Sequence, residues 1–122
     1  MTAEGERPYW FYVVACRDGS LYAGYTTDLD ARIEAHNAGA GAKYTRSRRP
    51  VRLVASAAFA TQHEALSAEF HFKRLTRARK LAFVALPADA FREKVLAELV
   101  TGGDGDAGRG MMQLAETDAR AE

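Results

Sequence analysis

Four polar side chains suited to phosphate chemistry are predicted to meet in the segment that runs from Trp10 to His36. Tyr12 lies in the middle of an apolar, strand-like run, and Tyr22 lies on the run that returns from it. Arg32 and His36 are four residues apart in a helix-like stretch, so their side chains share one face. Two phenols, a guanidinium and an imidazole in one place indicate a site that handles phosphate.

Positive charge is concentrated in the middle of the chain, although the net charge of the whole chain is only +1. Residues 43–80 hold ten basic and two acidic side chains, which is a net charge of +8. A basic middle between acidic ends is typical of a face that binds a polyanion, whereas the alternative is a solvated helix face beside a basic loop. We expect six residues of this window to contact nucleic acid, which are Lys43, Tyr44, Arg46, Arg48, Arg49 and Lys73.

Three short strands are expected to carry the two tyrosines and their neighbours, at residues 9–16, 21–25 and 51–59. Asp18-Gly19 is a strong hairpin signal, so the first two strands should be antiparallel. Gly24, at the end of the second strand, has a structural role because it leaves room for a ligand or another backbone. Alternation in the third strand predicts one half-buried face made of Val51, Leu53, Ala55, Ala57 and Phe59.

Four helices are expected, from near Asp28 to Gly39, from Thr61 to about Leu75, from 77 to 86 and from 89 to 100. Thr27 with Asp30, and Thr61 with Glu64, both fit the capping-box pattern at a helix start. Glu69 lies at the margin of the apolar stripe of the second helix, which is an unusual place for an unpaired carboxylate.

The element order ββαβααα predicts an α/β (α+β) fold, a small sheet flanked by helices. A chain of 122 residues with 48% apolar residues fits one domain with its own core. We expect that domain at 9–100, with a motif-bearing part at 9–86 and a last helix at 89–100. Residues 1–8 and the glycine-rich, acidic residues 101–122 are expected to be disordered.

Several classes of protein do not fit the sequence. The one cysteine, Cys16, cannot form an internal disulfide or a zinc site alone, and we expect it to be a small buried strand residue. The first eight residues contain acids and no apolar stretch, unlike a secretory signal, and no apolar run is long enough to span a bilayer. We therefore expect a cytoplasmic protein with no membrane partner.

The polar residues, taken in order, resemble the motif of the GIY-YIG nucleases, in particular the small stand-alone bacterial members. Trp10-Phe11-Tyr12 is followed after nine residues by Tyr22-Ala23-Gly24. Arg32 follows that glycine by eight residues, His36 follows by four more, and Glu69 lies on the second long helix. The resemblance extends over about residues 9–86.

This resemblance implies a three-stranded antiparallel sheet with a divalent-metal-dependent phosphodiesterase site on one face. By position, Tyr12 and Tyr22 are the motif tyrosines, Arg32 is the motif arginine, His36 is its helix partner and Glu69 is the metal-binding carboxylate. Mg²⁺ or Mn²⁺ would be the cofactor, and a single carboxylate suffices for Mg²⁺ in principle because this ion keeps most of its waters. The resemblance leaves open which tyrosine acts as the base.

The sequence departs from the family motif at three positions, which are Trp10, Ala23 and Tyr25. Trp10 stands in place of the first glycine and Ala23 in place of an isoleucine, and both are tolerable in strands. Tyr25 stands where some members have a lysine.

Our leading functional hypothesis is a metal-dependent DNA endonuclease that selects structure rather than sequence, with RNA not excluded as the substrate. The alternative is a non-catalytic nucleic-acid-binding module that retains the fold, and a third is a protein-interaction domain whose basic loop binds acidic partners. Each residue also has a structural interpretation. Tyr12 and Tyr22 could be core residues with bonded hydroxyls, and Glu69 could pair with Lys73 one helical turn away.

Overall fold

A three-stranded antiparallel sheet forms the centre of the computed structural model, which describes residues 7–100. Its strands are β1 (Tyr9–Ala15), β2 (Leu21–Thr26) and β3 (Arg52–Phe59), and they lie in the order β2-β1-β3. The segments expected to be disordered lie almost entirely outside the described residues. The sheet and its flanking helices confirm the predicted mixed α+β fold.

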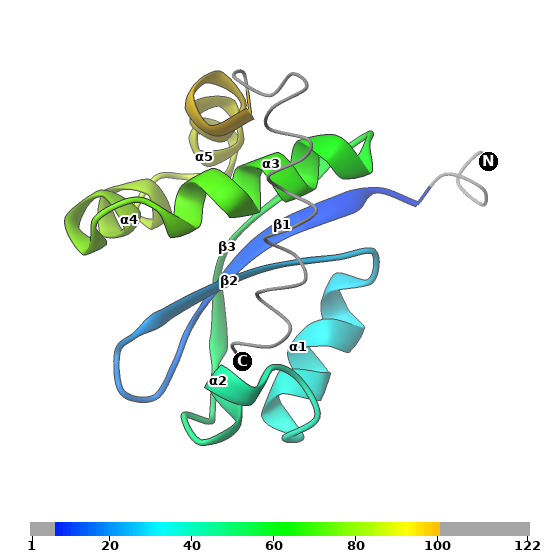
Figure 1. Ribbon diagram of the computed structural model, residues 1–122, viewed down its shortest axis with the longest axis vertical. Coiled ribbons are helices and arrows are strands. Elements are labelled where there is room, and N and C mark those ends of the chain that lie inside the picture. The colour runs from blue at the N-terminus through cyan, green and yellow to red at the C-terminus, as the bar shows by residue number, and fades with distance from the viewer. Residues whose placement is uncertain (1–6, 101–122) are drawn as a thin grey trace.

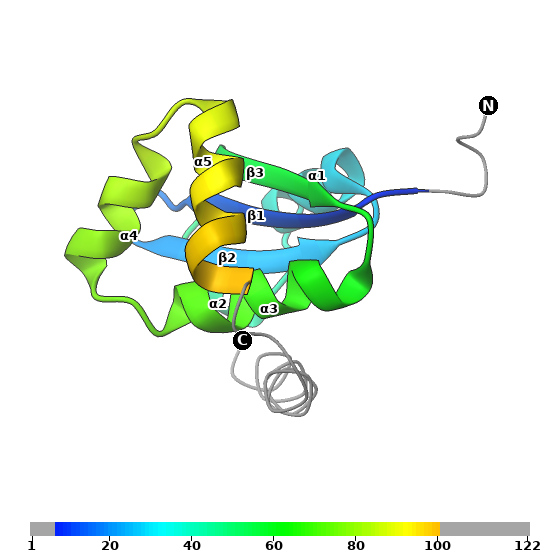
Figure 2. The same cartoon turned by 90° about the horizontal axis from the view of Figure 1, so that it is seen from above.

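Helices cover both faces of this sheet (Figure 1). One face carries α1 (Leu29–Asn37) and α2 (Lys43–Arg46). The other face carries α3 (Gln62–Lys73), α4 (Arg77–Val84), α5 (Ala88–Val95) and the π-helical turn η2 (Leu96–Val100). Seen from above, α3 runs along the side of β2, which is an edge strand, while α5 crosses over the strands (Figure 2).

Side chains that alternate along β1 create two cores, one on each face of the sheet. Phe11 and Val13 belong to the larger core under α3, α4 and α5. Tyr12, Val14 and the buried thiol of Cys16 belong to the smaller core, which is covered from α1 and α2. The second core is therefore the one that contains the motif tyrosine of β1.

Several local predictions are confirmed. Gly19 has φ +88° in the β1–β2 turn, and Gly39 has φ +85° after α1, a backbone conformation that L side chains rarely adopt. Thr61 and Glu64 form a complete capping box at the start of α3. The Thr76 side chain accepts a hydrogen bond from the Arg79 N–H and caps α4, which begins at Arg77 as predicted.

Two helix predictions are wrong. The side chain of Asp28, not that of Thr27, caps α1 by accepting a hydrogen bond from the Ala31 N–H at 3.1 Å. The basic stretch after α1 is not among the four predicted helices, yet it contains the short helix α2. A helix of four residues is too short to show an apolar period, so the pattern could not indicate it.

The predicted common face of β3 is also wrong. A β-bulge between Val13 and Val14 of β1 shifts the pairing, so that Val13 faces Ala55 and Val14 faces Leu53. Leu53 is 40% exposed as a result. Val51 packs in the smaller core while Ala57 and Phe59 pack in the larger one, so the alternating residues divide between the two faces. Among residues 7–100, no helix is long and apolar enough to cross a bilayer.

Candidate functional site

A line of three buried polar side chains crosses the smaller core from β1 to α2. The hydroxyl of Tyr12 lies 2.9 Å from Nε2 of His36, and Nδ1 of His36 lies 2.7 Å from Oγ1 of Thr45. All three residues are at most 2% exposed. Tyr12 and His36 are thus brought together as predicted, although 24 residues separate them in the chain.

The hydroxyl group of Thr45 determines the direction of these hydrogen bonds. Thr45 donates its only hydroxyl proton to the carbonyl of Ala42 at 3.0 Å, so its oxygen can only accept from His36 Nδ1–H. The Nε2 atom of a neutral His36 must then accept the proton of the Tyr12 hydroxyl. Burial, together with the nearby charge of Arg32, lowers the pKa of His36 to about 4, so the imidazole is neutral at pH 7.

Two glycines make room for this line. Tyr12 pairs with Gly24 across the β1–β2 ladder, and a Cβ on Gly24 would overlap the Tyr12 hydroxyl and lie 2.6 Å from its Cζ. A Cβ on Gly41 would overlap His36 Nδ1 and lie 2.9 Å from the His36 Cα. Each glycine allows a ring to take a position that a methyl group would occupy.

Tyr22 connects the buried line to the edge of the sheet. Its ring is 9% exposed and meets the His36 ring edge to face at 5.4 Å. The same ring stacks on Tyr44 of α2 at 5.9 Å, and the Lys73 ammonium lies 5.1 Å from its centroid. The two motif tyrosines therefore flank one imidazole.

Glu69 comes from the opposite layer of the molecule and approaches at the β2 edge. Its carboxylate is 5% exposed and lies 3.3 Å from the ammonium of Lys73, which is one helical turn further along α3. That ammonium also lies against the Tyr22 ring, so Glu69 is connected with the tyrosines through Lys73 and β2. The structural interpretation of Glu69, an ion pair with Lys73, is confirmed.

Arg32 lies on α1, one turn before His36, and its side chain is exposed. Its charge acts on the imidazole of His36. Within residues 7–100, no carboxylate forms an ion pair with Arg32. Its planar fork of donors is therefore available for two oxygens of a phosphate.

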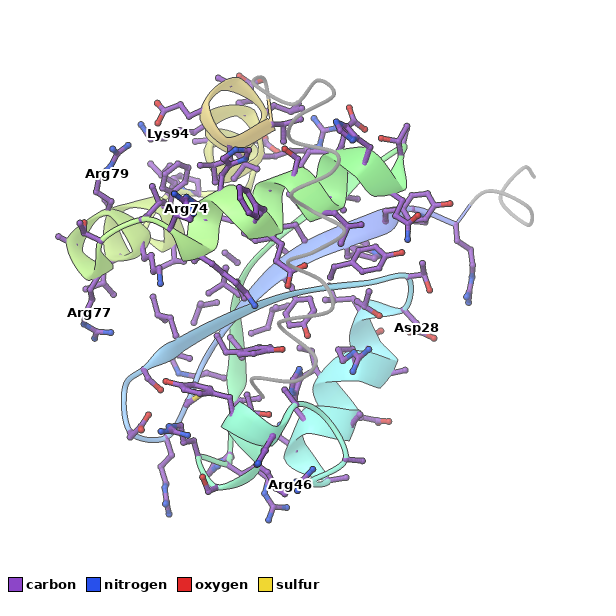
Figure 3. The ribbon with its side chains drawn as sticks, viewed as in Figure 1. Asp28, Arg46, Arg74, Arg77, Arg79 and Lys94 are labelled. Atoms are coloured by element: carbon purple, nitrogen blue, oxygen red, sulfur yellow. The ribbon has the colours of Figure 1, made fainter. Side chains whose placement is uncertain are left out.

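The residues expected to contact nucleic acid fall into two groups. Lys43 and Arg46 are exposed on α2, and Figure 3 shows Arg46 pointing away from the molecule. Arg48 is held instead, because it bonds Asp18 at 3.1 Å and its guanidinium lies 4.0 Å above the ring of Tyr44. That contact covers one face of the ring of Tyr44, a residue that is also expected to contact nucleic acid.

Arg49 donates to the carbonyl of Arg46 at 2.8 Å and lies 3.4 Å from the carbonyl of Asn37. Arg48 and Arg49 therefore stabilise the segment between α1 and β3 in addition to any contact with a ligand. Lys73 also has a structural partner, since it pairs with Glu69.

Three residues that support the site were missed in the sequence. Thr45 orients His36, Gly41 makes room for its ring, and the Asn37 amide bonds both the N–H and the carbonyl of Val51, at 2.7 and 3.0 Å. Asn37 thereby ties the end of α1 to the start of β3. The available signal was weak, because these small and polar residues are ordinary loop residues.

The donor set fits a hydrated divalent cation rather than a fully protein-bound one. No group of three or more potential acidic, histidine or cysteine ligands occurs in the described part of the chain. Glu69 offers one carboxylate that already binds a cation, the Lys73 ammonium. Mg²⁺ keeps several waters and needs only one or two carboxylates with substrate phosphate, so this single acid is compatible with it.

The chain is similar in sequence to known proteins. Residues 8–82 match the model of the GIY-YIG catalytic domain. A UPF0213 protein of Lacticaseibacillus paracasei is 58% identical over 78 residues, which are 64% of this chain and 88% of the relative. The UPF0213 protein YazA of Bacillus subtilis is 53% identical over 76 residues, 62% of this chain and 77% of the relative. A UPF0213 protein of Bacillus halodurans, solved by NMR, is 43% identical, with a TM-score of 0.46 over 75% of this chain and 97% of that one.

Proposed function

The chain belongs to the GIY-YIG family, and from that membership we propose that it is an endonuclease that hydrolyses phosphodiester bonds in DNA with Mg²⁺ or Mn²⁺. The observation that carries the proposal is the buried line from Tyr12 through His36 to Thr45, with the charge of Arg32 acting on its imidazole.

In this proposal Tyr12 is the base that receives a proton from the attacking water. A phenol has an ordinary pKa near ~10, so it acts as a base only if its own proton has a place to go. Nε2 of His36 accepts the Tyr12 hydroxyl proton in the ground state and is positioned to take it over. Arg32 holds the phosphate oxygens, and the phosphate charge in turn offsets the repulsion that Arg32 exerts on a protonated His36.

Glu69 is the residue that would hold the divalent cation. The bound metal would supply charge stabilisation at the phosphoryl oxygens and a more acidic water. The Lys73 ammonium contacts Oε2 of Glu69 and also lies beside the Tyr22 ring, where it could bind a substrate phosphate.

We propose that the enzyme selects the shape or an end of its substrate. The matched GIY-YIG region accounts for residues 8–82, and the described residues that follow it form the end of α4, α5 and η2 of the same layer. Nothing in residues 7–100 resembles a second module that could read bases. Contacts to backbone phosphates position a protein on a duplex without reading its sequence.

The test is a nicking assay on plasmid and branched DNA with Mg²⁺ or Mn²⁺. We expect Tyr12→Phe, Arg32→Ala and Glu69→Ala each to lose activity by about 100-fold or more. The matched controls are Glu93→Ala and Lys94→Gln, which remove one charge each from the exposed side of α5 and should keep full activity. Cleavage that persists in Glu69→Ala or Arg32→Ala would show that another site or a contaminant is responsible.

The same preparations decide between this proposal and its alternatives. Salt-sensitive DNA binding without cleavage in either metal would identify a non-catalytic binding module. If neither DNA nor RNA retards the protein at low salt, a protein-interaction domain becomes the better description.

A further inference from the structure

A pocket of about 330 Å³ adjoins the candidate site on the outer side of β2. Tyr22 and Lys73 line it and also belong to the site itself. Tyr44 of α2 and Lys80 of α4 complete its aromatic and basic walls. A ligand bound in the site by way of Tyr22 could therefore continue into this pocket without leaving the protein surface.

Lys80 lines the pocket and lies within the electrostatic influence of two further cations, Lys73 and Arg77. Lys80 is half-buried, and burial together with the charges of Lys73 and Arg77 lowers its pKa. Lys73 pairs with Glu69, but none of the described carboxylates forms an ion pair with Lys80. Like charges held together in a partly buried place cost stability, and an anion in the pocket would remove that cost.

The fold holds Lys80 in this position. Thr76 caps the start of α4, and Arg77 donates to the carbonyl of Gly19 in the β1–β2 turn at 3.2 Å. Figure 3 shows Arg77 at the start of α4, extending outward on the side of that turn. The Lys80 ammonium lies 5.9 Å from the centroid of the Phe72 ring, at the wall of the pocket. The cation is thus placed before any ligand arrives, which lowers the entropic cost of binding.

We propose that this pocket binds a second backbone phosphate of the nucleic acid, next to the phosphate in the catalytic site, with Lys80 as its main ligand. The stacked rings of Tyr22 and Tyr44 form part of the pocket wall beside that phosphate. This inference rests on the proposed function at one point, because it takes the nucleic-acid strand to reach the catalytic site past Tyr22. It adds a residue of α4 to the substrate-binding surface.

The first experiment measures binding without cleavage. The affinity of the full chain for a labelled branched DNA is measured by fluorescence anisotropy in EDTA over a range of salt concentrations. Lys80→Gln is compared with Lys94→Gln, which removes the same charge from α5 on the far side of α3 and α4. We expect Lys80→Gln to bind about tenfold more weakly and to lower the slope of log K against log salt by about one. If the two variants have the same affinity and slope, the inference is wrong.

The second experiment locates the phosphate. Neutral methylphosphonates are placed one at a time along the strand, and binding is measured with the wild type and with Lys80→Gln. At one position the neutral linkage should weaken the wild type but leave Lys80→Gln unchanged, because the partner of that phosphate is already missing. If every position weakens both proteins equally, Lys80 contacts no particular phosphate and the inference fails.

Both experiments measure binding, so their outcome does not depend on whether the protein cleaves DNA. If the protein does not cleave DNA but Lys80→Gln still shows its specific loss, the phosphate subsite stands and the hydrolytic proposal falls. If the protein cleaves DNA but Lys80→Gln behaves as Lys94→Gln does, the proposed function stands and the subsite falls.

Discussion

His36 has an unusual environment for a histidine near the end of a surface helix. It is 1% exposed, bonded at both ring nitrogens, and close to the charge of Arg32. Tyr12, Tyr22 and Thr45 surround its ring from β1, β2 and α2, and none of them carries a negative charge that would favour an imidazolium. The ring is therefore held neutral, and this has consequences for both stability and chemistry.

The first prediction concerns stability at acidic pH. The pKa of His36 is about 4 in the folded chain and about 6.5 when unfolded. Between these values the unfolded chain binds more protons, so the free energy of unfolding falls as the pH falls through this window. We expect His36 to account for a loss of about 2 kcal/mol between pH 7 and pH 5. Urea unfolding at pH 7, 6 and 5 should show this loss in the wild type and a flatter profile in His36→Gln.

The matched control is His63→Gln, which removes an exposed imidazole from the start of α3. The comparison uses the slope of the free energy of unfolding against pH rather than its absolute value, which removes any direct cost of the substitutions. Equal slopes in the wild type and in His36→Gln would show that His36 does not titrate as described.

The second prediction concerns the influence of Arg32 on His36. Removing a positive charge near an imidazole favours its protonated form, so Arg32→Ala should raise the pKa of His36. Because burial is the larger cause, the pKa should remain below its ordinary value. NMR titration of the His36 ring protons measures this directly. An unchanged pKa would mean that the arginine lies too far away to hold a phosphate at the same site.

At the scale of elements, the segment between α1 and β3 determines where His36 can point. Thr45 reaches His36 from α2, Asn37 ties the end of α1 to Val51, and Gly41 leaves the space in which the imidazole lies. These contacts join residues within one stretch of the chain. The segment between α1 and β3 thus fixes the position of the His36 side chain.

The third prediction tests this positioning of His36 by adding a methyl group at Gly41. In Gly41→Ala the new Cβ would overlap His36 Nδ1, and the His36 Cα lies only 2.9 Å away, so the helix end and the loop must separate. We expect a loss of about 1–3 kcal/mol in the free energy of unfolding, together with loss of nicking activity. The His36 ring resonances should shift as the bond to Thr45 is broken.

Gly19→Ala provides the control for backbone strain alone. It also places a methyl on a tight segment, but at φ +88° with nothing within 4 Å. We expect a cost of about 1 kcal/mol from the left-handed conformation and no change in the His36 resonances. If both variants leave those resonances unchanged, Gly41 has no positioning role.

The elements that the sequence indicated are those with local causes. Asp18-Gly19 determines the hairpin, and Thr61 with Glu64 begins α3, because each signal acts over three or four residues. The β-bulge at Val13 and Val14 has no such signal, and it decided which face each residue of β3 occupies. Local pattern therefore sufficed for the order of elements but not for the exact sheet.

The residues of the candidate site also divide into those that local pattern indicates and those that depend on the tertiary fold. Tyr12, Arg32 and His36 could be selected because a strand and a helix have known periods. Thr45 could not be selected, since its role depends on how α2 folds back onto α1. The pairing of Glu69 with Lys73 follows from helix spacing, but its position beside Tyr22 depends on how α3 lies along β2.

At the scale of the whole molecule, β2 is the strand that brings the two layers to one surface. Arg32 and His36 belong to the layer of α1 and α2, whereas Glu69 and Lys73 belong to the layer of α3. A site made only on one face of the sheet would lack either the arginine or the acid. Because β2 is an edge strand, side chains from both layers can meet beside it.

The basic residues, like the residues of the candidate site, come from both layers of the molecule. The basic residues of 43–80 occur before β3 and after it, and the fold places the two clusters on opposite sides of the β2 edge. Figure 3 shows Arg46 extending from α2 on one side and Arg74 at the end of α3 on the other. A polyanion that contacts both clusters would span the β2 edge, beside which Tyr22 and Lys73 lie.

The last prediction tests this path. Arg46→Gln and Arg74→Gln each remove one exposed cation, and the affinity for branched DNA is measured in EDTA from low to high salt. If one strand contacts both layers, each variant should lower the slope of log K against log salt by about one, and the double variant by about two. The effects should add because the two residues lie on different elements and have no common partner in the described structure. Lys94→Gln is again the charge control. A slope that changes with Arg46→Gln but not with Arg74→Gln would confine the DNA to the layer of α1 and α2, and Glu69 would then lie beside the path of the substrate instead of on it.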